Sequence, residues 1–195
     1  MDVSRRKERL RRELASRRSR VSAGDSEEAG RRVAARVAEL PGFGACRRLA
    51  LYAAVRGELP LAALAGLAAA RGLPLLWPRV VADRLEFVDA MPGELEAGTF
   101  GVPEPPVGRA PVSLAAGDWV VVPGLAFDAA GRRLGRGGGF YDRALAGCAE
   151  PVRVGVGYDF QCVDEVPAGP HDQPVDWVVT EGRVLAVRRA NREDP

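Results

Sequence analysis

The stretch that decides the fold of this chain runs from Trp119 to Arg143 and reads WVVVPGLAFDAAGRRLGRGGGFYDR. Its first residues form a short, fully apolar run that is typical of a strand buried on both faces, so we predict a strand over 119–122. Four glycines follow within five residues, and a helical pattern then extends over 140–148. A strand, a glycine-rich loop and a helix in this order predict an α/β protein whose loop backbone can approach a ligand closely.

The same loop gathers cations, which favours an anionic ligand. Arg132, Arg133, Arg136 and Arg143 flank the glycines. Exposed backbone N–H groups and the start of a helix complete a segment that suits a polyphosphate. The GxxxxGK[ST] order of a Walker loop is absent, and Phe140 stands where a GxGxxG fingerprint needs its last glycine. A flexible Arg/Gly loop without a ligand is the alternative interpretation at this point.

Outward from this unit, helical and strand patterns alternate along the chain. A basic helix is predicted over 3–20, and a second helix follows Ser22, which forms a capping-box pattern with Asp25. The other predicted elements are a helix over 61–71, strands over 48–54, 73–77, 84–90 and 152–158, a hairpin over 177–187 and a long loop over 91–113. We expect the strand over 73–77 to end at Pro78, because proline cannot donate to a sheet ladder.

The composition fits a single α/β domain over 1–195. Of these 195 residues, 47% are hydrophobic, which is enough for one sizeable core. The longest mainly apolar run, 59–70, holds about 12 residues, whereas a bilayer requires roughly 20. The amino terminus has charge but no apolar segment of a secretory signal. We therefore expect a cytoplasmic protein without a membrane span.

Charge is distributed unevenly along the chain. Residues 1–20 hold nine basic and three acidic residues, whereas the whole chain carries a formal net charge of only +2. Lys7 is the only lysine, and Arg11 follows it by four residues, which places both side chains on one face of the predicted helix. From the residues alone, a solvated basic helix or an RNA-binding arm accounts for most arginine-rich termini, and an anion-binding helix is the other interpretation.

Several motifs occur together in a recognisable order. They are KERLR at 7–11, GEL at 57–59, PEP at 103–105, VVPGLAFD at 121–128, RLGRGGGFYD at 133–142, VGYDFQ at 156–161 and HDQPVD at 171–176. In this set the chain resembles the 5-formyltetrahydrofolate cyclo-ligases, also called 5,10-methenyltetrahydrofolate synthetases. The segment 133–142 resembles the ATP-binding stretch of that family, and the matches extend over nearly the whole chain. The region around residues 80–100 offers no signature.

The resemblance implies a reaction and a fold. The reaction is the ATP-dependent conversion of 5-formyltetrahydrofolate to 5,10-methenyltetrahydrofolate, with release of ADP and phosphate and with Mg²⁺ as cofactor. Transfer of the γ-phosphoryl group to the formyl oxygen lets N10 attack and phosphate leave, which requires positioning and charge neutralisation rather than a protein nucleophile. The implied fold is a three-layer α/β/α domain of the NagB/RpiA type with a largely parallel sheet, preceded by basic N-terminal helices that close over the nucleotide.

The resemblance also assigns roles to single residues. Contacts to ATP would come from Lys7, Arg11, Arg133, Leu134, Gly135, Arg136, Gly137, Gly138, Gly139, Phe140 and Tyr141. Contacts to the folate would come from Ala53, Glu58, Arg136, Gly137, Gly138, Gly139 and Phe140. Asp142 and Asp172 would hold Mg²⁺, and Arg136 and Tyr141 would take part in catalysis. We expect Gly138 at a point where a side chain would clash with phosphate or require a positive φ.

Other interpretations stay open for some of these residues. Glu58 fits a surface residue that caps the next helix as well as a contact to the N–H donors of a pterin ring. Asp142 alone fits a charge at a helix start, and Asp172 alone fits a loop residue. Tyr141 and Tyr158 fit packing or pterin stacking better than acid/base roles, and packing best.

Two rival functions belong to other classes. One is an RNA-binding protein without enzymatic activity, although the chain lacks the interleaved aromatic residues of a stacking platform. The other is a paralogue that uses the ATP cradle on another formyl or acyl substrate. We expect a monomer that binds a reduced formyl-folate and neither nucleic acid nor a membrane.

Overall fold

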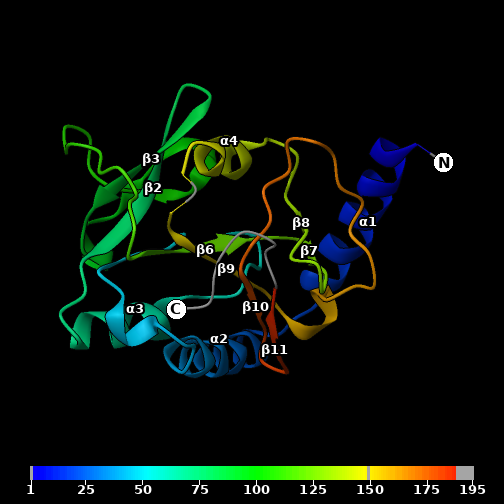
Figure 1. The fold of residues 1–195 in the computed structure, drawn as a ribbon, viewed down its shortest axis with the longest axis horizontal. Coiled ribbons are helices and arrows are strands. Elements are labelled where there is room, and N and C mark those ends of the chain that lie inside the picture. Colours follow the sequence, from blue (N-terminus) through cyan, green and yellow to red (C-terminus); the bar gives the residue numbers. More distant parts are fainter. Residues whose placement is uncertain (1, 149, 188–195) are drawn as a thin grey trace.

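A seven-stranded mixed sheet forms the centre of the molecule, in the order β11-β10-β9-β6-β1-β2-β3 (Figure 1). The computed structural model describes residues 2–148 and 150–187, so residues 1, 149 and 188–195 of the expected domain lie outside the described residues. The strands of this sheet are β1 (Arg48–Ala50), β2 (Leu75–Val81), β3 (Arg84–Asp89), β6 (Asp118–Pro123), β9 (Val152–Val156), β10 (Trp177–Val179) and β11 (Val184–Ala186). The helices are α1 (Val3–Arg18), α2 (Ala23–Ala38), α3 (Ala62–Ala70) and α4 (Phe140–Ala146).

Strand pairing is parallel in the middle of the sheet and antiparallel at both edges. The pairs β1–β2, β1–β6, β6–β9 and β9–β10 are parallel, whereas β2–β3 and β10–β11 are antiparallel. The predicted α/β class with a largely parallel sheet and preceding helices is thus confirmed. Among the described residues, no helix combines the length and the apolar character that crossing a membrane would need.

Both faces of the sheet are covered because side chains alternate along its central strands. In β1, Leu49 packs in the core that α2 and α3 complete, while Ala50 lies in the opposite core with Leu145 of α4. In β6, Val121 and Val120 divide between the same two cores. These strands are apolar throughout because both of their faces are buried, and the molecule consequently has three layers.

The two N-terminal helices have different roles. The Ser22 hydroxyl accepts a hydrogen bond from the Asp25 N–H at 3.1 Å, which starts α2 where the capping pattern predicts it. Val33 and Val37 of α2 are fully buried against the sheet. The helix α1 instead lies at one side of the molecule, away from β2 and β3 (Figure 1). Of these two helices, α1 is the one that lines the cleft described below.

The predicted end of the second strand at Pro78 is wrong, because β2 continues to Val81 and pairs Pro78 with Phe87 of β3. The Leu76 carbonyl accepts a hydrogen bond from Leu51 on the β1 side, and every second residue of a strand faces the same way. Pro78 therefore faces the side where β1 no longer pairs with β2, so its missing N–H breaks no ladder bond.

Three segments differ from their predicted extents. The first strand ends at Ala50 rather than 54, and the chain then turns through Arg56 and Gly57, whose φ values are 52° and 73°. The long loop over 91–113 contains the short strands β4 (Glu96–Ala97) and β5 (Pro103–Glu104), which pair antiparallel. The stretch that follows β6 contains a second small hairpin, β7 (Ala126–Phe127) and β8 (Arg133–Leu134).

Candidate active site

A cleft of about 440 Å³ lies beside the carboxyl ends of β1 and β6. In the sheet the chain proceeds from β1 to β3 on one side and from β6 to β11 on the other, so the strand order reverses between these two strands. Open α/β proteins bind their ligands at such a reversal. The cleft is lined by α1, the glycine-rich loop, β2 and the segment around β5. All of the site residues expected from the sequence line it.

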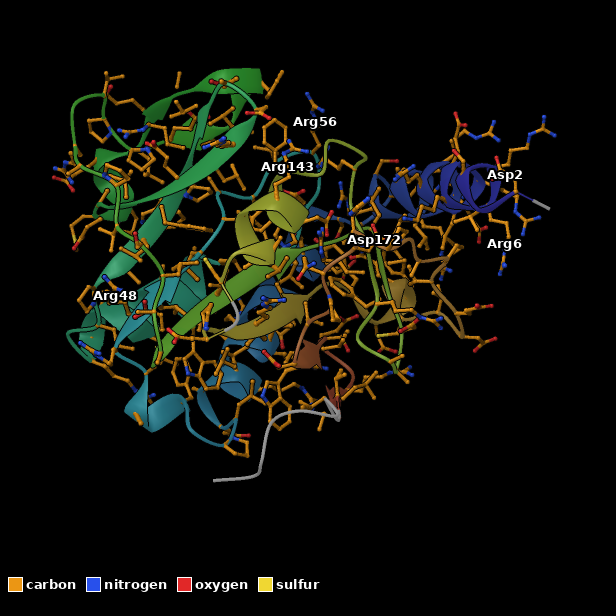
Figure 2. All side chains as sticks on the ribbon, turned by 45° about the horizontal axis from the view of Figure 1, so that its top comes forward. Asp2, Arg6, Arg48, Arg56, Arg143 and Asp172 are labelled. Carbon is orange, nitrogen blue, oxygen red and sulfur yellow. The ribbon has the colours of Figure 1, made fainter. Side chains whose placement is uncertain are left out.

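One face of α1 is directed at the cleft. The Lys7 ammonium donates to Asp172 Oδ2 at 2.5 Å, and Asp172 lies on the loop beside α1 (Figure 2). Arg11 Nε donates to the Gly135 carbonyl at 2.9 Å. Leu14, on the same face, is fully buried in a small core with Leu134. The predicted sharing of one helical face is confirmed, and that face is docked on the protein rather than solvated.

The glycine-rich loop owes its glycines to two different constraints. Gly137 and Gly139 have φ values of 105° and 67°, which only glycine adopts readily. Gly138 has no positive φ, so that one of the two alternatives predicted for it is wrong. A Cβ added there would instead lie 2.9 Å from the Phe140 ring, so close packing excludes a side chain. The loop therefore presents backbone to the cleft at Gly137, Gly138 and Gly139.

Two acidic residues meet on the α1 side of the cleft. Asp142 Oδ1 accepts hydrogen bonds from Arg133 at 2.8 Å and from the Gln173 N–H at 3.1 Å. Asp172 Oδ2 accepts from Lys7 and from the Gly169 N–H at 2.7 Å. Burial raises the pKa of Asp172, but its hydrogen bonds outweigh burial, so the net pKa is lowered and the group is ionised. Asp142 and Asp172 are thus held close together by neighbouring residues.

These two carboxylates fit a Mg²⁺ ion that shares its coordination with phosphate. The hydrogen bonds described above engage only one oxygen of each carboxylate, so the second oxygen is left for a metal. The described residues contain no cluster of three or more metal-ligating side chains. Mg²⁺ is commonly held by one or two carboxylates together with substrate phosphates and water, so two protein ligands suffice.

Glu58 and Arg136, which both line the cleft, form an ion pair. Arg136 donates to Glu58 Oε1 through Nη2 at 2.9 Å and through Nε at 3.1 Å. The other carboxylate oxygen of Glu58 accepts from the Val55 N–H at 3.1 Å. The helix-capping alternative for Glu58 is wrong, since α3 follows Leu61 without any side-chain cap. Ala53 lines the same part of the cleft.

The aromatic residues separate into two groups. Tyr158 stacks on Phe160 with ring centroids 5.5 Å apart and does not line this cleft, so it has a packing role. Tyr141 lines the cleft, and its hydroxyl is buried without a hydrogen-bond partner among the described residues. Burial raises the pKa of Tyr141, so the phenol stays neutral and its proton is available for donation.

Sequence reasoning missed two charged residues of the cleft. Arg18, 4% exposed, and Glu104, 8% exposed, both line it, and each has a buried polar atom without a partner among the described residues. Arg18 lies eleven residues after Lys7, so helical spacing along α1 was a usable signal. Glu104 had only the motif at 103–105, which carries no information about burial. The apolar part of the cleft includes Val80 and Leu85, in the region without a sequence signature.

The fold and the cleft define an open α/β protein with a ligand site at the reversal point of its sheet and a glycine- and arginine-rich loop suited to phosphate. The model of the 5-formyltetrahydrofolate cyclo-ligase family matches residues 3–181. The chain belongs to this family.

Individual relatives agree with this assignment. The 5-formyltetrahydrofolate cyclo-ligase of Escherichia coli (strain K12) is 33% identical over 179 residues, which cover 88% of this chain and 98% of that protein. The one of Mycolicibacterium smegmatis is 40% identical over 119 residues, covering 60% of this chain and 56% of that protein. The solution structure of 5,10-methenyltetrahydrofolate synthetase from Aquifex aeolicus has a TM-score of 0.83 and 32% identity, and the match covers 97% of this chain and 96% of that one.

Proposed function

We propose that this protein catalyses the ATP-dependent cyclisation of 5-formyltetrahydrofolate to 5,10-methenyltetrahydrofolate, with release of ADP and phosphate. Membership of the cyclo-ligase family gives the reaction class. The observation that carries the proposal is a single cleft in which a cationic glycine-rich loop adjoins an apolar region. A phosphate donor and a flat reduced folate need these two environments side by side.

The chemistry explains why a phosphate donor is required. The formyl group on N5 is amide-like, so its carbon is a poor electrophile and its oxygen does not leave. When bound, MgATP supplies the γ-phosphoryl group that turns this oxygen into a leaving group as N10 closes the ring. The protein has to align the two substrates and stabilise the charge that develops on the transferred group.

The α1 helix and the loop supply that stabilisation. Lys7, Arg11 and Arg133 place positive charge along one wall of the cleft. Along the loop, the absence of side chains lets a ligand approach the backbone closely at Gly135, Gly137, Gly138 and Gly139. Leu134 is fully buried behind the loop and fixes its position on α1 through Leu14. We infer that the phosphate groups lie between α1 and this loop.

Arg136 and Tyr141 are the residues that we assign to the reacting atoms. Arg136 pairs with Glu58 within the cleft, and we assign its guanidinium to the formyl oxygen or the phosphoryl group. The neutral Tyr141 hydroxyl has no internal acceptor among the described residues, so it can donate to an oxygen that gains negative charge. Phe140 forms an edge-on pair with Phe100 at 6.4 Å, which helps to exclude water from the site.

Asp142 and Asp172 are the residues that we assign to Mg²⁺, since each has an oxygen free of the hydrogen bonds described above. In this role the two carboxylates would hold the positive charge of Mg²⁺ against the phosphates, and neither would act as a nucleophile.

An absorbance assay with purified protein tests the proposed function. The methenyl product absorbs differently from 5-formyltetrahydrofolate, so we expect a signal only when ATP, Mg²⁺ and this folate are all present. Phosphate should be released in equal amount to the product. Absence of product from protein that binds both substrates would contradict the reaction. Faster turnover of another formyl or acyl compound would favour the paralogue.

The remaining partner expectations stay predictions. We expect a monomer that does not bind nucleic acid, because the chain lacks the interleaved aromatic residues of a stacking platform. Filter binding of RNA at several salt concentrations and size-exclusion chromatography test these two points.

A further inference from the structure

Glu104 is a buried carboxylate that the roles assigned above do not use. It belongs to β5, lines the cleft and is only 8% exposed. Among the residues that the structure describes, no donor lies within hydrogen-bonding distance of its Oε1 atom. A buried carboxylate oxygen without a donor is costly, so its retention calls for an explanation, and a functional role in the cleft is one of these.

The position of this carboxylate is fixed by its neighbours. In the β4–β5 hairpin, Glu104 is paired with Glu96. The side chain of Glu104 also lies directly over Gly98, where an added Cβ would be 2.5 Å from the Glu104 carboxyl carbon. Glycine at 98 therefore leaves the space that the Glu104 side chain occupies. A carboxylate held in this way offers a preorganised acceptor to a ligand.

Glu58, the acid that the sequence assigns to the folate, is less suitable as such an acceptor. Its Oε1 already accepts two hydrogen bonds from Arg136, and its Oε2 accepts one from the Val55 N–H. The guanidinium of Arg136 also neutralises its charge. Glu104 has no cation partner among the described ion pairs, so its charge is not neutralised and its Oε1 lacks a donor.

The surroundings of Glu104 identify the ligand chemistry. Val80, Leu85, Phe100 and Val102 line the same cleft and offer apolar surface to a flat ring. The phosphate-binding residues lie on α1 and the glycine-rich loop, and α1 and β2 lie on opposite sides of α4 (Figure 1). An anionic carboxylate among apolar side chains suits an uncharged ring that carries N–H donors better than it suits a phosphate.

We propose that the Glu104 carboxylate binds the N3–H and 2-amino donors of the pterin ring and so determines the orientation and selection of the folate. This inference rests on the proposed function, which supplies a pterin as substrate. Two adjacent N–H donors match the two oxygens of one carboxylate. Adenine presents one amino group next to an acceptor nitrogen, so the same carboxylate fits its edge less well.

The test compares Glu104→Gln with the matched control Glu96→Gln. Both residues belong to the same hairpin and are paired across it, but Glu96 is exposed and does not line the cleft. Steady-state kinetics give KM for each substrate, and calorimetry without ATP gives folate affinity directly. Loss of a charge-assisted contact should raise KM for the folate by about 10- to 100-fold. KM for ATP should stay nearly constant, and Glu96→Gln should change neither value.

A substrate analogue supplies a second test, which changes the ligand as well as the protein. In 5-formyltetrahydrofolate with a methyl group in place of the 2-amino group, one of the two donors is absent. Wild-type protein should bind this analogue more weakly than the parent folate, and Glu104→Gln should discriminate much less between the two. Equal discrimination by the wild type and Glu104→Gln would overturn the proposal. A rise in KM for ATP alone would also overturn it, in favour of adenine.

The outcomes separate this inference from the proposed function. Normal turnover with unchanged folate affinity in Glu104→Gln would contradict the role of Glu104 and leave the reaction intact. Folate binding that depends on Glu104 in a protein without turnover would contradict the reaction and support the pterin contact. The melting temperature of ligand-free Glu104→Gln should equal or exceed that of the wild type, because the substitution removes an unpaired buried charge.

Discussion

At the scale of single residues, most of the charged side chains assigned to the site form ion pairs with one another. Each of three pairs joins a cation and a carboxylate: Lys7 with Asp172, Arg133 with Asp142 and Arg136 with Glu58. A polyphosphate that enters the cleft competes with these carboxylates for the cations. The binding free energy that each cation contributes is therefore the difference between its contact with phosphate and its lost contact with the carboxylate.

Asp142→Asn should lower kcat/KM for MgATP by about 10- to 100-fold, because the variant lacks one metal-binding charge. The asparagine oxygen can still accept from Arg133 and the Gln173 N–H, so the fold should be largely retained. Higher Mg²⁺ concentrations should partly restore activity, which a titration of Mg²⁺ in the steady-state assay measures. Asp83→Asn, which changes an exposed carboxylate, is the control. A Mg²⁺ dependence identical to that of the wild type would rule out the metal assignment.

At the scale of elements, α1 and the glycine-rich loop form the two walls of the proposed phosphate site. Neither has a sheet partner, so their relative position depends on a small core. Leu14 and Leu134 are its fully buried members from the two walls. Polar contacts such as Arg11 to Gly135 then fix the orientation of the helix.

Lys7→Ala should weaken ATP binding about 10-fold while the melting temperature changes little, since Leu14 still anchors α1. Calorimetric titration with a non-hydrolysable ATP analogue measures this effect. Arg9→Ala, an exposed residue of the same helix that does not line the cleft, should bind the analogue as the wild type does. Equal affinity of the two variants would mean that Lys7 serves only its ion pair with Asp172.

Gly138→Val should reduce ATP affinity and turnover much more than stability. An added Cβ lies 2.9 Å from the Phe140 ring, so a branched side chain must displace that ring from the cleft wall. The loop lies outside the main cores, which limits the change in melting temperature. Gly138→Ala should show a smaller effect of the same kind. Gly147→Ala is the control, because an added Cβ there has no neighbour within 4 Å among the described residues. Normal ATP binding by the valine variant would place the nucleotide elsewhere.

At the scale of the whole molecule, the reversal point that creates the cleft is also secured by charge. Arg48 of β1 and Asp118 of β6 are paired in register, and their side chains form an ion pair at the end of the strands opposite the cleft. Asp118 is 1% exposed and also accepts from the Ala115 N–H at 2.8 Å. Burial opposes the ionisation of Asp118, but these hydrogen bonds prevail and lower its pKa.

Asp118→Ala should lower the free energy of unfolding by about 2–3 kcal/mol at neutral pH. Because the pKa of Asp118 is lowered in the folded state, its stabilisation is complete above the ordinary aspartate range, about pH 4, and is lost as the pH falls through the folded pKa. Urea unfolding at pH 7 and at decreasing pH should therefore show a difference from the wild type that shrinks in acid. Asp164→Ala, an exposed control, should show no such difference. A difference that stays constant below pH 3 would contradict the role of this ion pair.

Some properties of the site were predictable because they depend on short stretches of chain. The apolar run over 119–122, the glycines of 135–139 and the spacing of Lys7 and Arg11 each fix a local conformation or a shared face. Chain order and the resemblance of several motifs then indicated the family. The end of β2 was not predictable in this way, because Pro78 is tolerated only through the early end of the neighbouring strand.

The sequence by itself determined the α/β class, the glycine-rich loop, the basic first helix and the family of this protein. Only the tertiary structure decided which charges are already paired and which remain open. Glu58 and Glu104 both lie next to loop residues, so the sequence does not distinguish them. Glu58 is neutralised by Arg136, 78 residues away, whereas Glu104 is buried beside the cleft and its Oε1 has no donor among the described residues. Burial and pairing are set by residues distant in sequence, so no local pattern carries them.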